Sequence, residues 1–119
     1  MYRALVPRFA AIDVGSNASR LLVVEAEQPG EVRPIAQLRA PVRMGHGVFV
    51  TGRLDPEAID GAVAAMRSFR DAMDEHEVES YRAVVTASAR DAENADDLLS
   101  RVRAAGIELE AIDGTEEAR

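Results

Sequence analysis

Residues 9–27 read FAAIDVGSNASRLLVVEAE, two apolar runs separated by a cluster of turn residues. The runs at 9–14 and 20–27 are short and contain β-branched side chains, and the sequence between them is typical of a tight turn. We therefore predict two β-strands joined by a short loop. Because Gln28-Pro29-Gly30-Glu31 is a second turn signal, the stretch at 32–42, with its two prolines, is predicted to be a third strand at a sheet edge.

A helix is predicted after Leu54-Asp55-Pro56-Glu57, because Asp55 can cap free amides and Pro56 suits a first helical turn. Its apolar residues recur at three- and four-residue spacing, which places them on one helix face up to about His76. They are Ile59, Ala62, Val63, Met66, Phe69 and Met73.

The remaining chain is predicted to add a strand at 81–86, a helix that Asn94 caps and Gly106 ends, and a strand at 107–112. The element order is then βββαβαβ. This order predicts an α/β fold with a mixed five-stranded sheet, in which the later strands pair in parallel through right-handed crossovers.

Composition narrows the class of protein. A chain of 119 residues is one domain at most, and 47% hydrophobic with 29% charged residues is ordinary for a folded protein. The absence of cysteine excludes disulfides, thiolate metal sites and a cysteine nucleophile, and the absence of lysine excludes a P-loop. No apolar run is long enough to span a bilayer, so we expect a cytoplasmic protein without a membrane partner.

Charge is unevenly distributed along the chain. Residues 1–54 hold seven arginines and four acidic residues, net +3, whereas residues 55–119 hold seven arginines and seventeen acidic residues, net −10. The overall charge of −7 argues against a nucleic-acid partner. The N-terminal half remains suited to a local anion, although the charge balance taken alone favours a solvated acidic helical surface.

Three places carry residues suited to phosphate chemistry. In the loop at 13–17, Gly15 lets backbone amides turn toward a ligand, Ser16 and Asn17 add donors, and Asp13 can hold a divalent cation. A β-turn built from ordinary turn residues is the alternative for this loop alone.

Arg20 and Arg90 both lie where a predicted strand meets a loop, and a guanidinium forks onto phosphate oxygens. For a single arginine, a solvated side chain or a surface ion pair is the alternative. In the third place, at 114–119, one carboxylate of the Glu116-Glu117 pair can take a proton from water, although such pairs also begin helices. His46 and His76 lack metal-ligand spacing, and the loop at 44–47 can be a hinge or a plain turn.

Together these residues resemble the exopolyphosphatase and guanosine pentaphosphate phosphatase (Ppx/GppA) family. Four motifs occur in the order and spacing of that family, and in register they favour ligand binding over a plain turn and surface arginines. They are Asp13-Val14-Gly15-Ser16-Asn17, Thr51-Gly52-Arg53-Leu54, Thr86-Ala87-Ser88-Ala89-Arg90-Asp91-Ala92 and Gly114-Thr115-Glu116-Glu117-Ala118-Arg119.

The resemblance implies a ribonuclease-H-like lobe of the actin-like ATPase (sugar kinase/actin/Hsp70) fold, and roles for individual residues. It implies that Asp13 helps to place Mg²⁺ and that Glu117 is the base that activates water. It also implies phosphate contacts from Gly15, Ser16, Asn17, Arg20 and Arg90. The implied reaction removes terminal phosphate from inorganic polyphosphate, or the 5′ γ-phosphate from guanosine pentaphosphate.

The resemblance further implies that residues 1–119 are a single N-terminal lobe and that the second lobe is absent from this chain. We therefore expect partners of two kinds: polyphosphate or guanosine penta- or tetraphosphate, and the missing lobe or a homodimer partner. Whether the chain is an enzyme by itself stays open. The alternatives are a non-catalytic phosphate- or alarmone-binding module and a fragment that is inactive alone; a sugar-kinase or actin-like ATPase lobe fits the motifs less well.

Overall fold

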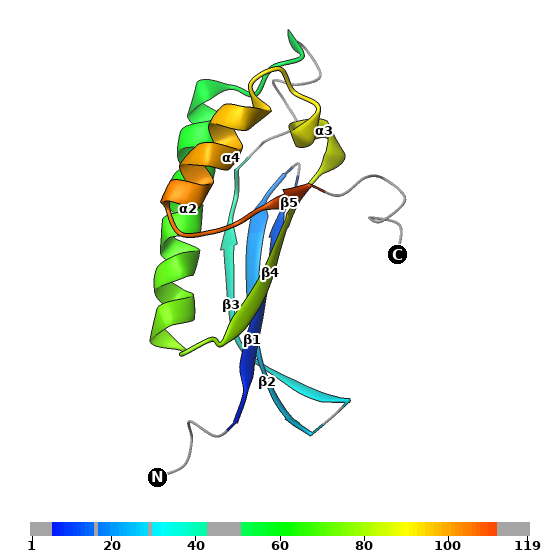
Figure 1. The fold of residues 1–119 in the computed structure, drawn as a ribbon, viewed down its shortest axis with the longest axis vertical. Coiled ribbons are helices and arrows are strands. Elements are labelled where there is room, and N and C mark those ends of the chain that lie inside the picture. The colour runs from blue at the N-terminus through cyan, green and yellow to red at the C-terminus, as the bar shows by residue number, and fades with distance from the viewer. Residues whose placement is uncertain (1–5, 16, 29, 43–50, 112–119) are drawn as a thin grey trace.

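The computed structural model describes residues 6–15, 17–28, 30–42 and 51–111. Figure 1 shows a twisted sheet with the two longer helices on one side. The elements follow in the order β1 (Arg8–Val14), β2 (Ser19–Gln28), β3 (Glu31–Ala40), α2 (Pro56–Glu75), β4 (Ser80–Val85), α3 (Ala87–Arg90), α4 (Ala95–Ala104) and β5 (Glu110–Ala111).

The sheet has the strand order β3-β2-β1-β4-β5. β1 pairs antiparallel with β2, and β2 with β3, so the three predicted N-terminal strands form a meander with β3 at the edge. β4 lies parallel to β1, and β5 lies parallel to β4. The predicted mixed α/β sheet and the parallel pairing of its later strands are therefore confirmed.

The last strand is shorter than predicted. Of the expected strand at 107–112, only Glu110–Ala111 pairs with β4 among the described residues, so β3, β2, β1 and β4 form the body of the sheet. Ile107 donates its N–H to the Val102 carbonyl at 3.2 Å, which closes α4. The N–H of Glu108 is bound by the Tyr81 hydroxyl at 3.0 Å. Because the amides of Ile107 and Glu108 have hydrogen-bond partners other than β4, β5 begins only at Glu110.

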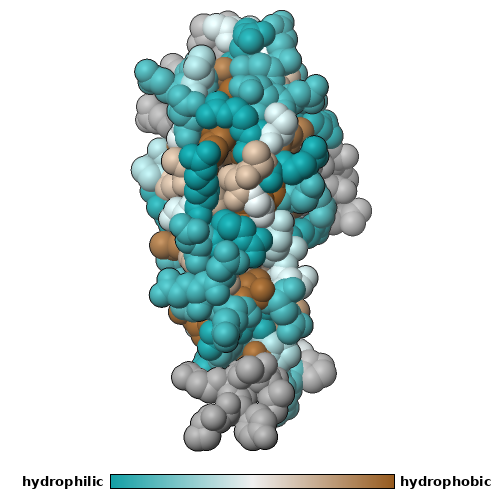
Figure 2. Space-filling view, turned by 60° about the vertical axis from the view of Figure 1, so that its left-hand side comes forward, coloured by the Kyte–Doolittle hydropathy of each residue, from teal (hydrophilic) through white to brown (hydrophobic). Residues whose placement is uncertain are grey.

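Helix α2 covers one face of the sheet and packs beside α4 (Figure 1). Its buried residues are those that the periodicity predicts, with Ala65 in addition. Phe69 is 2% exposed and is the largest fully buried side chain of the described chain. Burial of such a side chain contributes about 1.5–3 kcal/mol of transfer free energy. The opposite side of α2 is mainly hydrophilic, with small scattered apolar areas (Figure 2).

The helix ends follow the prediction in position but not in every contact. Asp55 and Asn94 occupy the N-cap positions of α2 and α4, but neither side chain makes a capping hydrogen bond. The Asn94 amide instead accepts from the Leu54 N–H at 2.8 Å and donates to the Leu54 carbonyl at 3.0 Å. Gly106 ends α4 as predicted, at φ +99°, a conformation that favours glycine.

A buried carboxylate ties the three N-terminal strands together at the end away from α3. The Glu25 side chain, 7% exposed, forms ion pairs with Arg8, at 3.0 Å, and with Arg33. The hydrogen bond from Arg33 lowers the pKa of the Glu25 carboxyl; burial opposes this shift and Arg8 adds to it. None of the helices in the described ranges has an apolar stretch of the length needed to cross a bilayer.

Candidate functional site

The candidate site lies at the edge of the sheet where the parallel strands β1, β4 and β5 end. Val14 and Val85 are direct partners there, and Val85 is in turn the partner of Ala111. The Thr86 N–H donates to the Val14 carbonyl at 3.3 Å, so α3 begins directly beside the end of β1. Ligands of open α/β sheets bind outside such carboxyl ends.

The loop after β1 is a closed turn. Gly15 donates its N–H to the Ala18 carbonyl at 2.9 Å. A Cβ at position 15 would lie 3.1 Å from that oxygen, so a larger residue would need the Ala18 carbonyl to shift by a few tenths of an ångström. Since this hydrogen bond uses the Gly15 N–H within the turn, the exposed Asn17 is the described loop residue best placed to offer donors to a ligand.

Asp13 is exposed on the sheet face that α2 does not cover, one residue before the end of β1. Its direct partner on β2 is Arg20, which is also exposed. The described ranges contain no group of three or more histidine, cysteine or acidic side chains that could enclose a metal. One carboxylate still fits Mg²⁺, which is commonly held by one or two carboxylates together with waters and substrate phosphates.

Arg90 is the last residue of α3 and points into solvent. Its main chain is fixed because its N–H donates to the Thr86 carbonyl at 3.1 Å. Its guanidinium contacts the neighbouring Asp91 at 3.1 Å. An exposed ion pair of this kind contributes only about 0–1 kcal/mol, so an arriving phosphate can compete for the guanidinium.

Several predicted residues lie outside the described part of the chain. These are Ser16, His46, the loop at 44–47 and Glu117. The described chain reaches Ala111, whose partner Val85 is also adjacent to Val14. The last described residue therefore lies at the same edge of the sheet, and the role of Glu117 as a base stays a prediction.

The Thr51-Gly52-Arg53-Leu54 motif lies in a structural junction. Besides the Asn94 bridge to Leu54, the Gly52 carbonyl accepts the Glu93 N–H at 3.0 Å, and Arg53 pairs with Glu93 at 3.1 Å. These contacts hold the start of α2 against the start of α4, and so they fix the segment that follows α3. The motif therefore acts on the candidate site indirectly, by holding Glu93 and Asn94, which follow α3 in the chain.

One residue of the site escaped the sequence reasoning. Arg39 of β3 is the direct partner of Arg20, so both guanidinium groups extend from the open face of the sheet. Arg39 belongs to no motif, and only the strand register brings it to this place. Together, Asp13, Arg20 and Arg39 can neutralise a polyanion and hold a cation beside it, and Arg90 follows from the helix that begins at the same edge of the sheet.

Comparison with known proteins assigns the chain to one protein family. Residues 23–119 match the model of the Ppx/GppA phosphatase family. Exopolyphosphatase 1 of Mycobacterium tuberculosis is 34% identical over 113 residues, which is 94% of this chain and 33% of that protein. Exopolyphosphatase 1 of Mycobacterium leprae matches over the same shares. The chain thus spans about a third of the length of the curated relatives it matches.

Solved structures agree with this assignment. The crystal structure of the Ppx/GppA family member of Aquifex aeolicus has 32% identity and a TM-score of 0.88, covering 94% of this chain and 37% of that one. An exopolyphosphatase from Cytophaga hutchinsonii has 30% identity and a TM-score of 0.87, covering 93% and 36%. Thermus thermophilus RuvC, at 15% identity and a TM-score of 0.54 over 91% of this chain and 64% of that one, shares the fold alone. The architecture is a ribonuclease-H-like lobe of the actin-like ATPase fold.

Proposed function

Because the chain belongs to the Ppx/GppA phosphatase family and corresponds to its N-terminal portion, we propose that it is the phosphate-binding lobe of a phosphohydrolase. The reaction is removal of terminal phosphate from inorganic polyphosphate, or of the 5′ γ-phosphate from guanosine pentaphosphate. One observation carries the proposal. The hydrogen bond between Thr86 and Val14 brings the loop after β1 and the arginine of α3 to one edge of the sheet.

Each described residue then has a task that its position allows. Arg20 and Arg90 approach the phosphate from β2 and α3 and neutralise its oxygens through charge-assisted hydrogen bonds. The exposed Asn17 side chain orients the terminal group, while the hydrogen bond from the Gly15 N–H to the Ala18 carbonyl closes the loop beside it. Holding a phosphoryl group in line with its attacking water is the main requirement of this chemistry.

Asp13 is the proposed contact to Mg²⁺, directly or through water. Its exposed carboxylate and its adjacency to Arg20 fit a cation shared with substrate oxygens. When bound, Mg²⁺ supplies charge neutralisation on the transferring group. Glu117 is proposed as the base that takes the proton of the attacking water. A second lobe or a homodimer partner is proposed to complete the other side of the phosphate site.

The test uses phosphate release from long-chain polyphosphate and from guanosine pentaphosphate in the presence of Mg²⁺. In a full-length relative such as exopolyphosphatase 1 of Mycobacterium tuberculosis, glutamine at the position aligned with Glu117 is expected to slow release by about 10²-fold or more. Glutamine at the position aligned with Glu116 is the matched control and leaves release nearly unchanged. Equal rates for the two variants refute the assigned base.

The 119-residue chain alone is expected to bind these compounds and to release little phosphate. A second outcome is that full-length relatives need the glutamate aligned with Glu117, but this chain binds the phosphate compounds and releases no phosphate even when a second lobe is supplied. The chain is then a non-catalytic binding module. If the chain binds no phosphate compound at all, the proposed function is wrong.

A further inference from the structure

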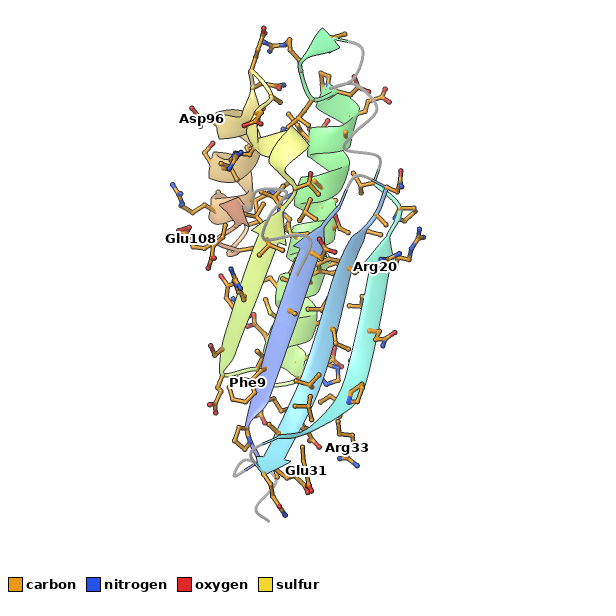
Figure 3. All side chains as sticks on the ribbon, turned by 90° about the vertical axis from the view of Figure 1, so that its right-hand side faces the viewer. Phe9, Arg20, Glu31, Arg33, Asp96 and Glu108 are labelled. Atoms are coloured by element: carbon orange, nitrogen blue, oxygen red, sulfur yellow. The ribbon has the colours of Figure 1, made fainter. Side chains whose placement is uncertain are left out.

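Three charged residues form a row across the open face of the sheet. Asp13 of β1 is the direct partner of Arg20 on β2, and Arg20 is the direct partner of Arg39 on β3. Directly opposed residues of antiparallel strands point to the same face, with Cβ atoms about 4.5–5.5 Å apart. Figure 3 looks onto this face, with Arg20 near the ends of the strands and α2 behind the sheet.

The two arginines of this row differ from most others in the molecule. Among the described arginines, those without an ion pair are Arg20, Arg39 and Arg67. Arg67 lies apart on α2. Like charges directly opposite each other on neighbouring strands destabilise a sheet. An anionic ligand lying between Arg20 and Arg39 would convert this repulsion into attraction.

The space beside the row can hold such a ligand. A hollow of about 460 Å³ is bordered by Asp13, Arg20, Gln37 and Arg39, with Ala11 and Leu22 among the apolar residues that line it. Among the described residues that line the hollow, Asp13 carries the one carboxylate and lies two strands away from Arg39, and Gln37 adds an amide. The hollow begins beside Asp13 and extends across β2 to the edge strand.

We propose that Arg39 is a further phosphate-contacting residue and that Arg20 and Arg39 hold successive phosphate groups of an oligophosphate that crosses the open sheet face. This inference rests on the proposed function, because it takes the terminal group to lie at the loop after β1. A single phosphate at that loop reaches Arg20, whereas Arg39 lies one strand further away. Arg39 therefore selects ligands with two or more linked phosphates over inorganic phosphate.

Isothermal calorimetry on the 119-residue chain, without divalent cations and at low salt, tests this selection with tripolyphosphate and inorganic phosphate as probes. Losing one charge-assisted contact in Arg39→Gln is expected to weaken tripolyphosphate binding about tenfold, with less than about a twofold change for inorganic phosphate. Arg39→Lys keeps the positive charge but loses the two-pronged guanidinium contact. Its affinity for tripolyphosphate is expected to lie between those of the unsubstituted chain and of Arg39→Gln. Arg67→Gln is the matched control, because it removes the same charge from an exposed, unpaired position on α2 and should leave both affinities unchanged.

Guanosine triphosphate is a third probe, because it carries three linked phosphates on a nucleoside, whereas tripolyphosphate carries them alone. A loss with both triphosphates assigns Arg39 to the phosphates themselves, whereas a loss confined to the nucleotide assigns it to the nucleoside and overturns the inference. Arg39→Gln can instead leave both affinities unchanged, as Arg67→Gln does, while Arg20→Gln weakens the binding of both tripolyphosphate and inorganic phosphate. In that case Arg39 does not contact phosphate, and the proposed function stands. If the unsubstituted chain binds no probe, the proposed function fails as well. Unfolding midpoints equal to that of the unsubstituted chain exclude misfolding of the variants.

Discussion

Asn94 joins two segments that lie 40 residues apart, and its replacement by alanine is a quantitative test of the junction beside the site. Its side chain satisfies both the N–H and the carbonyl of Leu54, at 2.8 and 3.0 Å. Leu54 is 1% exposed, so both main-chain groups would lose their partners in a buried position. A hydrogen bond contributes about 0.5–1.5 kcal/mol net, and buried groups left unpaired bring the loss toward the upper end. We expect Asn94→Ala to destabilise the chain by about 2 kcal/mol.

For a chain of 119 residues, this loss corresponds to a fall in Tm of about 8 °C, since unfolding entropy near 2.1 cal/mol/K per residue gives roughly 4 °C per kcal/mol. Urea unfolding gives the free energy, and hydrogen exchange of the Leu54 amide reports the junction itself. Asn94→Asp keeps an acceptor for the Leu54 N–H but sets a carboxylate oxygen against the Leu54 carbonyl, so it is also expected to destabilise the chain. A loss below about 0.5 kcal/mol in Asn94→Ala, with unchanged exchange at Leu54, would refute the reasoning.

Three further predictions concern the core, a buried hydroxyl and pH. Phe69→Ala removes the largest buried side chain and is expected to cost about 3–5 kcal/mol in urea unfolding; less than about 1 kcal/mol would mean that α2 does not pack as described. Ser19→Ala removes a buried Oγ that has no hydrogen-bond partner within the described chain, and should raise the free energy of unfolding by about 1 kcal/mol, whereas a loss of that size would reveal a partner. Because Arg33 lowers the folded-state pKa of Glu25 below its unfolded value of about 4.3, its stabilising contribution is complete above that pH and is lost as the pH falls through the folded-state pKa. Unfolding free energies from about pH 7 to pH 3 should therefore fall less steeply in Glu25→Gln, and parallel curves would contradict this assignment.

Local patterns predicted β1, β2 and α2 because each of them has one buried face, and they predicted β3, which has no buried residue, from its turn signal and prolines. The apolar spacing from Ile59 to Met73 matches the face that α2 buries, and the turn signals around Gly15 and Gly30 separate β1, β2 and β3. The two prolines in the third segment correctly predicted an edge strand. At Pro34 the register with β2 shifts, which the loss of one N–H donor accounts for.

Tertiary contacts decided the features that these patterns missed. Asn94 has the sequence position of a cap, yet Leu54, distant in the sequence, takes its hydrogen bonds. Residues 107–109 have the alternation of a strand, but the amide of Ile107 closes α4 and that of Glu108 meets Tyr81. Such competition between partners depends on the folded arrangement.

In the candidate site, too, some residues were predictable from local sequence and others only from the folded arrangement. Asp13, Arg20 and Arg90 were predicted from residue type and their places at strand ends, and the structure brings Asp13 and Arg20 together as direct partners. Arg39 could be found only from the register of β2 with β3, because its surroundings in the sequence carry no signal. Ser16 and Glu117 lie outside the described residues, and their roles stay predictions.

The central claim is that phosphate binds at the edge where β1 ends beside α3. The most direct test is a titration of the ¹⁵N-labelled 119-residue chain with tripolyphosphate and Mg²⁺, followed by ¹H–¹⁵N correlation spectra. We predict that the largest chemical-shift changes occur in the amides of residues 13–17 and 86–90, and that Arg90→Gln reduces them. Changes centred on the β2–β3 turn or on the outer side of α2, or no changes at all, would contradict it.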